Sequence, residues 1–193
     1  MENLLPIIFI YILVDNFVLQ QFLGICPFIG VSRKMETATG MGMAVVFVMA
    51  MATVATWSLY TYVLVPFNLQ YLEIVAFILV IAALVQLVET FLRKISPTLY
   101  QGLGIYLPLI TTNCAVLAVA LLAVRQEFTL LESTVFAVAA AVGFSLALLI
   151  MAGIRERLEL AAVPKMLQGS AITLITAGIL SLAFMGFKGM MTL

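Results

Sequence analysis

The run LLESTVFAVAAAVGFSLALLIMAG at residues 130–153 contains a single charged residue, Glu132. About 20 consecutive apolar residues are enough for a helix to cross the hydrocarbon core of a bilayer. The run is therefore predicted to be a transmembrane helix, and it indicates the fold class of the whole chain.

The rest of the composition agrees with this interpretation. Of the 193 residues 65% are hydrophobic and 9% are charged, and there is no histidine. Soluble domains have roughly 25% charged residues, so a soluble globular protein is excluded. The sequence predicts an all-α integral membrane protein that lies in the lipid bilayer, with six transmembrane helices and almost nothing outside them. The predicted spans are Leu4–Leu23, Met41–Val65, Leu72–Leu92, Gly104–Val124, Leu130–Gly153 and Ser170–Phe187.

The six spans form one transmembrane domain, residues 1–193, with two halves at about 1–96 and 97–193. The halves weakly repeat each other in VDNFVL at 14–19 and TTNCAVL at 111–117, each with an asparagine in mid-span. Because each half has three spans, a repeat would have opposite orientations in the membrane. We then expect Asn16 and Asn113 to meet near the midplane.

Small residues at a spacing of four, such as Ala139, Gly143 and Ala147, indicate close packing of helices in lipid.

The basic residues indicate the orientation. The connections after the first, third and fifth spans hold seven Lys and Arg, and the opposite side holds only Arg125 and Lys188. Basic residues favour the cytoplasmic side, so both termini are predicted to lie outside the cytoplasm. With zero net charge and no long basic cluster, nothing indicates nucleic-acid binding. The seven residues are Arg33, Lys34, Arg93, Lys94, Arg155, Arg157 and Lys165.

Two cysteines are the candidate ligands of a metal site. Cys26 lies in FLGICPFIGVS at 22–32, and Cys114 lies in LPLITTNCAVLAVALL at 107–122. Thiolates select zinc, copper(I) and iron–sulfur clusters, so two of them suggest half of a soft-metal site. The alternative for each cysteine alone is a small buried apolar residue, and a disulfide has little support within a membrane.

Each cysteine lies beside a feature that interrupts helices. Thr111, Thr112 and Asn113 precede Cys114 and could donate hydrogen bonds to a sulfur ligand or satisfy locally opened backbone, and Pro108 can kink the helix. Gly24 and Pro27 flank Cys26 closely, so its thiol is expected to project from irregular backbone.

Other charged residues are less specific. Asp15 is the only acid well inside a span, and it is either an ion or proton ligand or a neutral hydrogen-bonding group. The charged run at residues 155–159 is most simply a solvated or interfacial helix end.

Long stretches of the chain resemble the A subunits of the Rnf complex and, more distantly, the E subunit of the sodium-translocating NADH:quinone reductase. They are FLGICPFIGVSRKMETATGMGMA (22–44), LGIYLPLITTNCAVLAVALL (103–122), GIRERLELAAVPKMLQG (153–169) and AITLITAGILSLAFMGF (171–187). Pro27, Thr112 and IRERL at 154–158 favour Rnf.

This resemblance implies a six-span inverted repeat in a prokaryotic cytoplasmic (inner) membrane, paired with the homologous Rnf E subunit of opposite orientation. Cys26 and Cys114 match the positions that supply half of the ligands of a shared [2Fe–2S] cluster. Asn113, Thr112 and Gly24 are then candidates for tuning it, and Asp15 and Asn16 for an ion path.

The resemblance also implies electron transfer between ferredoxin and NAD, coupled to sodium or proton movement, with flavins and further iron–sulfur centres in partner subunits. No catalytic acid, base or nucleophile is assigned to this chain, so it holds no complete active site alone.

Two other functions remain open at this stage. One is an inverted-repeat ion channel or transporter without a redox centre, with Asp15, Asn16 and Asn113 as a midplane cation site. The other is an assembly protein that only packs against its partners.

Overall fold

The structure is a computed structural model that describes residues 8–95, 107–161, 164 and 167–191. All regular elements in these ranges are helices, which confirms the all-α class. They are the π-helix η1 (Ile10–Val14), α2 (Ile25–Val31), α3 (Met35–Leu59), the π-helix η2 (Tyr60–Leu64), the 3-10 helix η3 (Gln70–Leu72), α4 (Glu73–Ile95), α6 (Leu107–Thr111), α7 (Cys114–Arg125), α8 (Leu130–Glu159) and α9 (Ser170–Met191).

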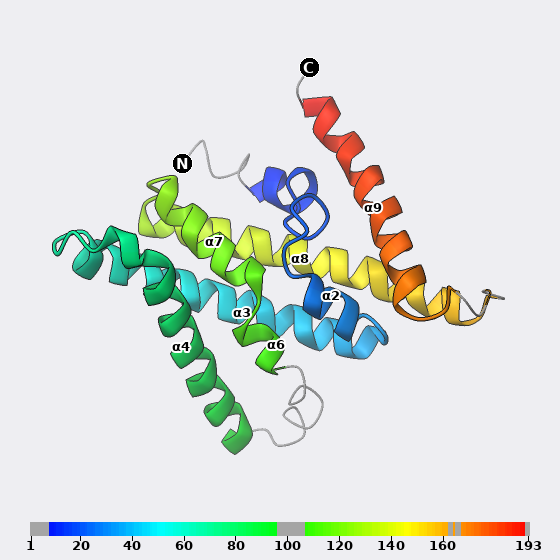
Figure 1. The fold of residues 1–193 in the computed structure, drawn as a ribbon, viewed down its shortest axis with the longest axis horizontal. Helices are drawn as coiled ribbons and strands as arrows, with labels where there is room; N and C mark the ends of the chain where they lie inside the picture. Colours follow the sequence, from blue (N-terminus) through cyan, green and yellow to red (C-terminus); the bar gives the residue numbers. More distant parts are fainter. Residues whose placement is uncertain (1–7, 96–106, 162–163, 165–166, 192–193) are drawn as a thin grey trace.

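Helices α3 and α8 form the centre of the molecule, where they lie side by side and antiparallel (Figure 1). The start of α3 contacts the end of α8, because Met35 N donates to Glu156 Oε1 at 3.0 Å. At the other end, Trp57 Nε1 donates to Phe128 O, just before α8, at 2.9 Å. Both helices contribute fully buried side chains to one hydrophobic core, among them Ala38, Met41 and Val45 of α3 and Ala141, Phe144 and Ala147 of α8.

Helix α8 begins at the predicted residue because its first turn is capped. Thr129 Oγ1 accepts from Glu132 N at 3.4 Å, and Glu132 Oε2 accepts from Thr129 N at 3.0 Å. This reciprocal arrangement satisfies backbone donors that have no partner inside the helix. At its other end α8 continues to Glu159, six residues beyond the predicted Gly153.

Two interruptions of helical backbone lie beside this pair. Residues 15–24, between η1 and α2, are turns and loop, and Thr112 and Asn113 separate α6 from α7. We call these segments the first and second breaks. Pro108 lies inside α6, and the second break comes four residues later, so Pro108 does not itself make the interruption.

The first break is anchored to α8 by Asn16 and Gly143. Asn16 is fully buried, and its Nδ2 donates to Gly143 O at 2.6 Å. A Cβ on Gly143 would lie 2.7 Å from Tyr11 O and 3.2 Å from Ile12 O. The missing side chain therefore lets the backbone of η1 lie directly on α8, as the small-residue spacing predicts.

Five of the six predicted spans are confirmed as helical segments long and apolar enough to cross a membrane. They are Met35–Leu64, Gln70–Thr90, Pro108–Arg125, Leu130–Glu159 and Ser170–Phe187. The remaining predicted span, Leu4–Leu23, is not confirmed: residues 15–24 are turns and loop, so the helix breaks earlier than its predicted end at Leu23. Residues 4–7 and 104–106 of the predicted spans lie outside the described residues.

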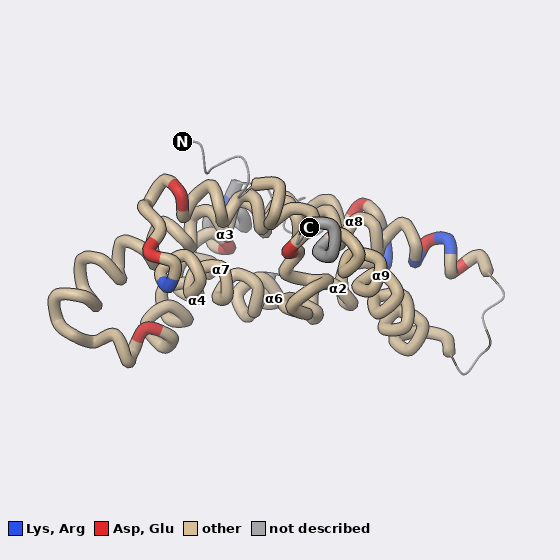
Figure 2. Tube along the Cα trace, turned by 90° about the horizontal axis from the view of Figure 1, so that it is seen from above, with Lys and Arg blue, Asp and Glu red and all other residues tan. Residues whose placement is uncertain are grey.

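Helices α4 and α9 lie at opposite ends of the central pair and lean away from it (Figure 1). Their outer faces expose apolar side chains such as Val75, Leu79, Ile179 and Leu182. Among the described residues, most acidic and basic ones lie towards the two ends of the molecule, and a few acidic ones lie nearer its middle (Figure 2). This distribution suits a body whose middle lies in lipid.

Gly143→Ala tests the close approach of η1 to α8. The added Cβ would meet backbone atoms that cannot rotate away, so we expect a loss of stability of about 1–3 kcal/mol. Thermal unfolding of the purified protein in one detergent measures it. Gly178→Ala in α9 is the matched control, since nothing lies within 4 Å of its Cβ position. Equal unfolding midpoints for the two variants would contradict the role given to Gly143.

Candidate functional site

Cys26 is the second residue of α2 and is exposed. The helix begins after Gly24, whose φ of 78° and ψ of 30° are in the left-handed region that favours glycine. Pro27 and Phe28, which follow the cysteine, are both buried. Cys26 therefore lies in the first turn of a helix that is held by its neighbours, and the expectation that it projects from irregular backbone was wrong.

Cys114 is the first residue of α7 and is also exposed. Asn113 caps this helix, since its Oδ1 accepts from Ala115 N at 3.0 Å. Asparagine is among the preferred residues at this position because its side chain satisfies a backbone donor of the first turn. The cysteine thus follows directly on the polar residue that starts the half-helix.

The two breaks touch each other at Gly24. A Cβ at this position would lie 3.0 Å from Asn113 Oδ1, 3.4 Å from the Cβ of Ala115 and 2.8 Å from Cε2 of Phe144. Gly24 precedes Cys26 by two residues, and Asn113 and Ala115 flank Cys114. Two half-helices with an exposed cysteine in the first turn therefore begin beside one another.

Asn113 has one buried group without a partner. The residue is 4% exposed, and its Nδ2 has no hydrogen-bond partner in the part of the chain that the structure describes. Its Oδ1 is fixed by the cap to Ala115, so the amide group cannot turn over without losing that bond. A buried donor that is left unpaired costs about 1–3 kcal/mol, and a nearby acceptor would relieve this cost.

The neighbouring Thr112 is used differently. Its side chain is exposed, and its Oγ1 donates to Pro108 O at 3.0 Å. A hydroxyl has one proton to donate, so Thr112 cannot keep this bond and also donate to a sulfur. Of Thr112 and Asn113, Asn113 is therefore the residue with a side-chain donor that has no partner among the described residues.

A cavity of about 290 Å³ lies beside the second break. Its polar wall is made by Thr111, Thr112, Asn113 and Cys114, and its apolar wall comes mainly from Ile78, Ile81 and Ala82 of α4, with Leu117. The first break is covered more closely by α9, with a cavity of about 80 Å³ between them. Cys114 and Asn113 therefore line this cavity, although the Nδ2 atom of Asn113 is itself buried.

Asp15 and Asn16, the candidates for an ion path, both lie at the start of the first break. Asp15 is half-buried. Asn16 Oδ1 accepts from Val18 N at 3.1 Å, which matches the bond that Asn113 makes to the residue two positions on. No hydrogen bond joins the amides of Asn16 and Asn113 in the described ranges, and their meeting near the midplane stays a prediction.

Sequence reasoning missed the residues that fix α9 to the first break. Ser181 Oγ donates to Leu19 O at 2.6 Å, and Gln20 Nε2 donates to Phe184 O at 3.4 Å. A serine and a glutamine within apolar runs were the available signal, because buried side-chain donors in lipid need partners.

A metal at this site would need ligands from outside. Over the residues that the structure describes, no group of three or more His, Cys, Asp or Glu is arranged to hold a metal ion. The two thiols are of the type that binds iron in an iron–sulfur cluster, and an amide N–H such as that of Asn113 is of the type that donates to the sulfur atoms of a cluster.

Comparison with a family model and with known proteins identifies the same family of membrane-protein subunits. The family model described as "Rnf-Nqr subunit, membrane protein" matches residues 4–191. The A subunit of an ion-translocating oxidoreductase complex from Syntrophotalea carbinolica is 60% identical over 190 residues, 98% of each chain. The A subunit of a Na(+)-translocating ferredoxin:NAD(+) oxidoreductase complex from Acetobacterium woodii is 59% identical over 179 residues, 93% of each chain.

A third relative, the A subunit of the ion-translocating oxidoreductase complex of Escherichia coli K12, is 57% identical over 182 residues, 94% of each chain. The matched regions include both breaks and both cysteines, since the family model covers nearly the whole sequence. The chain therefore belongs to the Rnf-Nqr family of membrane-protein subunits.

Proposed function

We propose that this chain is the A subunit of an Rnf-type complex, which couples electron transfer between ferredoxin and NAD to ion movement across a membrane. Relatives 57–60% identical carry names that state an ion-translocating oxidoreductase, which supports the proposal. The observation in this chain that carries it is the contact between the two breaks, because it brings together two half-helices that each expose a cysteine.

The role proposed for this chain is a transmembrane electron relay through a shared [2Fe–2S] cluster. Such a cluster takes four thiolates, whereas this chain has two cysteines in all. Cys26 and Cys114 would supply two ligands, and a homologous E subunit of opposite orientation would supply the others. When bound, the cluster would accept and release single electrons.

The residues around the cysteines have separate tasks in this proposal. Gly24 leaves the space that lets the first break lie on Asn113 and Ala115. Asn113 starts α7 through its Oδ1 and has Nδ2 available as a donor to a sulfur atom. Hydrogen bonds to cluster sulfurs raise the reduction potential, because they stabilise the more negative reduced state.

We propose further that the chain crosses the membrane six times as two inverted repeats. Each half has the same order: a broken helix, a long helix and a peripheral helix. These are η1 with α2, α3 and α4 in one half, and α6 with α7, α8 and α9 in the other. The matching bonds of Asn16 and Asn113, and the antiparallel packing of α3 on α8, support the repeat.

An ion path is proposed along the first break. Asp15 offers a carboxylate there, next to unwound backbone whose carbonyl oxygens can also bind a cation. Asn16 would stabilise the first break rather than bind the ion, since its side-chain amide donates to Gly143 O and accepts from Val18 N. Sodium and protons are both compatible with a carboxylate at this position.

The proposed orientation has both termini on the outer side of a prokaryotic cytoplasmic membrane. Arg33 and Lys34 follow α2, and Arg155 near the end of α8 donates to Ser32 Oγ, so these basic residues share one end. Arg125 lies at the other end, 3.5 Å from Glu73. Lys165, which also contributed to the count, lies outside the described residues.

Cys114→Ser and Cys26→Ser test the cluster. In a complex purified with its membrane partners, each variant is expected to lose the [2Fe–2S] EPR signal and the matching iron and sulfide, while the flavins stay. Ser145→Ala is the control, because its hydroxyl only bonds within α8. An unchanged signal in both cysteine variants, with ion transport intact, would favour a channel or transporter without a redox centre.

Asn113→Ser tests the spare donor. Serine also caps helices well, so α7 should persist while the amide N–H is lost. The cluster potential is expected to fall by about 40 mV, the equivalent of one hydrogen bond of about 1 kcal/mol for one electron. A redox titration followed by EPR measures it. Thr112→Val is the control and should leave the potential unchanged; equal shifts in both variants would contradict the assignment.

Reporter fusions test the orientation. A reporter that is active only in the cytoplasm should be active when fused after Leu160, at the end of α8, and inactive when fused after Leu193. The reverse pattern would show that the basic residues had been assigned to the wrong side.

A further inference from the structure

Two adjacent charged residues at the end of α8 bind the chain where α2 ends and α3 begins, and we call this set of hydrogen bonds the grip. Arg155 Nη1 donates to Ile29 O at 2.6 Å and to Ser32 Oγ at 2.9 Å. The next residue, Glu156, accepts from Met35 N through Oε1 at 3.0 Å. The sequence alone suggests that the charged run at 155–159 is a solvated helix end. The structure shows more, because two of its residues bind residues more than 120 positions away in the chain.

These bonds satisfy helix ends that lack internal partners. The last carbonyls of a helix and its first N–H groups have no donor or acceptor within it. Ile29 O belongs to the last turn of α2, and Met35 N is the first donor of α3, whose N-cap residue Lys34 makes no side-chain cap. Arg155 and Glu156 supply the missing partners, with positive charge at a helix end and negative charge at a helix start, which is the favourable sense.

The gripped residue is close to the candidate cluster ligand. Ile29 follows Cys26 by three residues, about 4.5 Å along the axis of an α-helix. Because α2 runs only from Ile25 to Val31, a shift at its last turn moves its first turn as well. Ser32 is fully buried, which keeps the Arg155 bond away from competing water.

Helix α7, which carries Cys114, is held in another way. The connection from α7 to α8 receives a neutral donor, Trp57 Nε1, on Phe128 O. Arg125 at the end of α7 is largely exposed, and its 3.5 Å contact with Glu73 is long. The charged grip thus distinguishes the Cys26 half-helix from the Cys114 half-helix.

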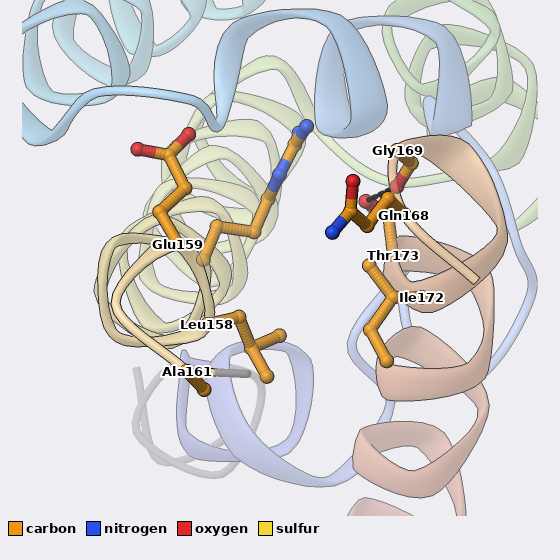
Figure 3. A pocket seen from close by; sticks show the side chains of 8 residues that line it. Leu158, Glu159, Ala161, Gln168, Gly169, Ile172 and Thr173 are labelled. Carbon is orange, nitrogen blue, oxygen red and sulfur yellow. Dashed lines mark hydrogen bonds between the residues drawn. The ribbon is translucent and has the colours of Figure 1, made fainter. Parts of the chain in front are cut away.

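Arg155 also borders a cleft of about 310 Å³ between the end of α8 and the start of α9. Leu158 and Glu159 form one side of it and Gln168, Ile172 and Thr173 the other (Figure 3). This open space lies between Arg155 and the start of α9. Its hydrogen bonds to Ile29 and Ser32 hold its guanidinium.

We propose that Arg155 and Glu156 are positioning residues that fix α2, and through it the thiol of Cys26. The importance of that thiol rests on the proposed function, whereas the fixing of α2 does not. A cluster ligand has to be held to within about 0.5 Å by supporting contacts, and this pair provides them from α8.

Hydrogen–deuterium exchange of the assembled complex tests the grip directly. In Arg155→Gln, amides of residues 25–34 are expected to exchange about tenfold faster, the effect of losing a charge-assisted hydrogen bond, while residues 114–125 stay unchanged. Arg155→Lys should be intermediate because one donor remains. Ser32→Ala, which keeps the arginine, should accelerate the same segment to a smaller extent.

Arg157→Gln is the matched control, since it removes the same charge from an exposed position two residues along. The proposal is overturned if Arg155→Gln and Arg157→Gln exchange alike, or if residues 25–34 and 114–125 loosen equally, which would mean general destabilisation.

EPR of the same samples separates the two proposals. If the grip positions Cys26, Arg155→Gln should shift the cluster's g-values or potential with its iron retained, and Arg155→Lys should restore them in part. Faster exchange at 25–34 in a complex that holds no cluster would support the grip and overturn the redox function. Normal exchange in a complex with an unaltered cluster would overturn the grip and leave the redox function standing.

Discussion

The contact of Asn16 and Gly143 is the interaction on which the rest of the arrangement depends. In the hydrocarbon core of a membrane, backbone N–H and C=O groups must find partners within the protein. The first break opens ten residues of backbone, 15–24, and Asn16 joins it to α8 through Gly143 O while its own Oδ1 takes the N–H of Val18. Without a glycine at 143 the backbones could not approach this closely.

From this follows a difference between the two breaks. The first has its polar groups engaged by α8 and α9, through Asn16, Gln20 and Ser181. The second has a matching bond at Asn113, but the buried Nδ2 of this residue has no partner in the described part of the chain, and the residue lines a larger cavity together with the exposed Cys114. The first break is therefore stabilised by its own hydrogen bonds, whereas the second keeps a donor that has no partner in the described residues.

The sequence predicted most of the helices, because long apolar runs are a strong signal and five spans were confirmed. It also predicted that both cysteines lie beside interruptions. It did not predict the extent of the first break, since residues 4–23 are as apolar as a true helix and only the long-range bond of Asn16 to Gly143 explains the unwinding. The sequence did not predict the hydrogen bonds of Arg155 for the same reason. A charged run at a helix end does not indicate partners as distant in the chain as Ile29 and Ser32, which lie 126 and 123 residues away.

Side chains at both ends of the α3–α8 pair form hydrogen bonds with backbone groups of neighbouring segments, but the two ends use different side chains. Near the end of α3, an indole N–H donates to the backbone of the connection between α7 and α8, and near the end of α8, a guanidinium and a carboxylate bind the backbone of α2 and α3. Trp is common at a membrane interface because its ring is apolar and its N–H is polar. Charged groups are tolerated where basic residues gather, at the end assigned to the cytoplasm. The end with the stronger bonds is the one that holds the shorter half-helix, α2, which has only seven residues and little propensity to stay formed alone.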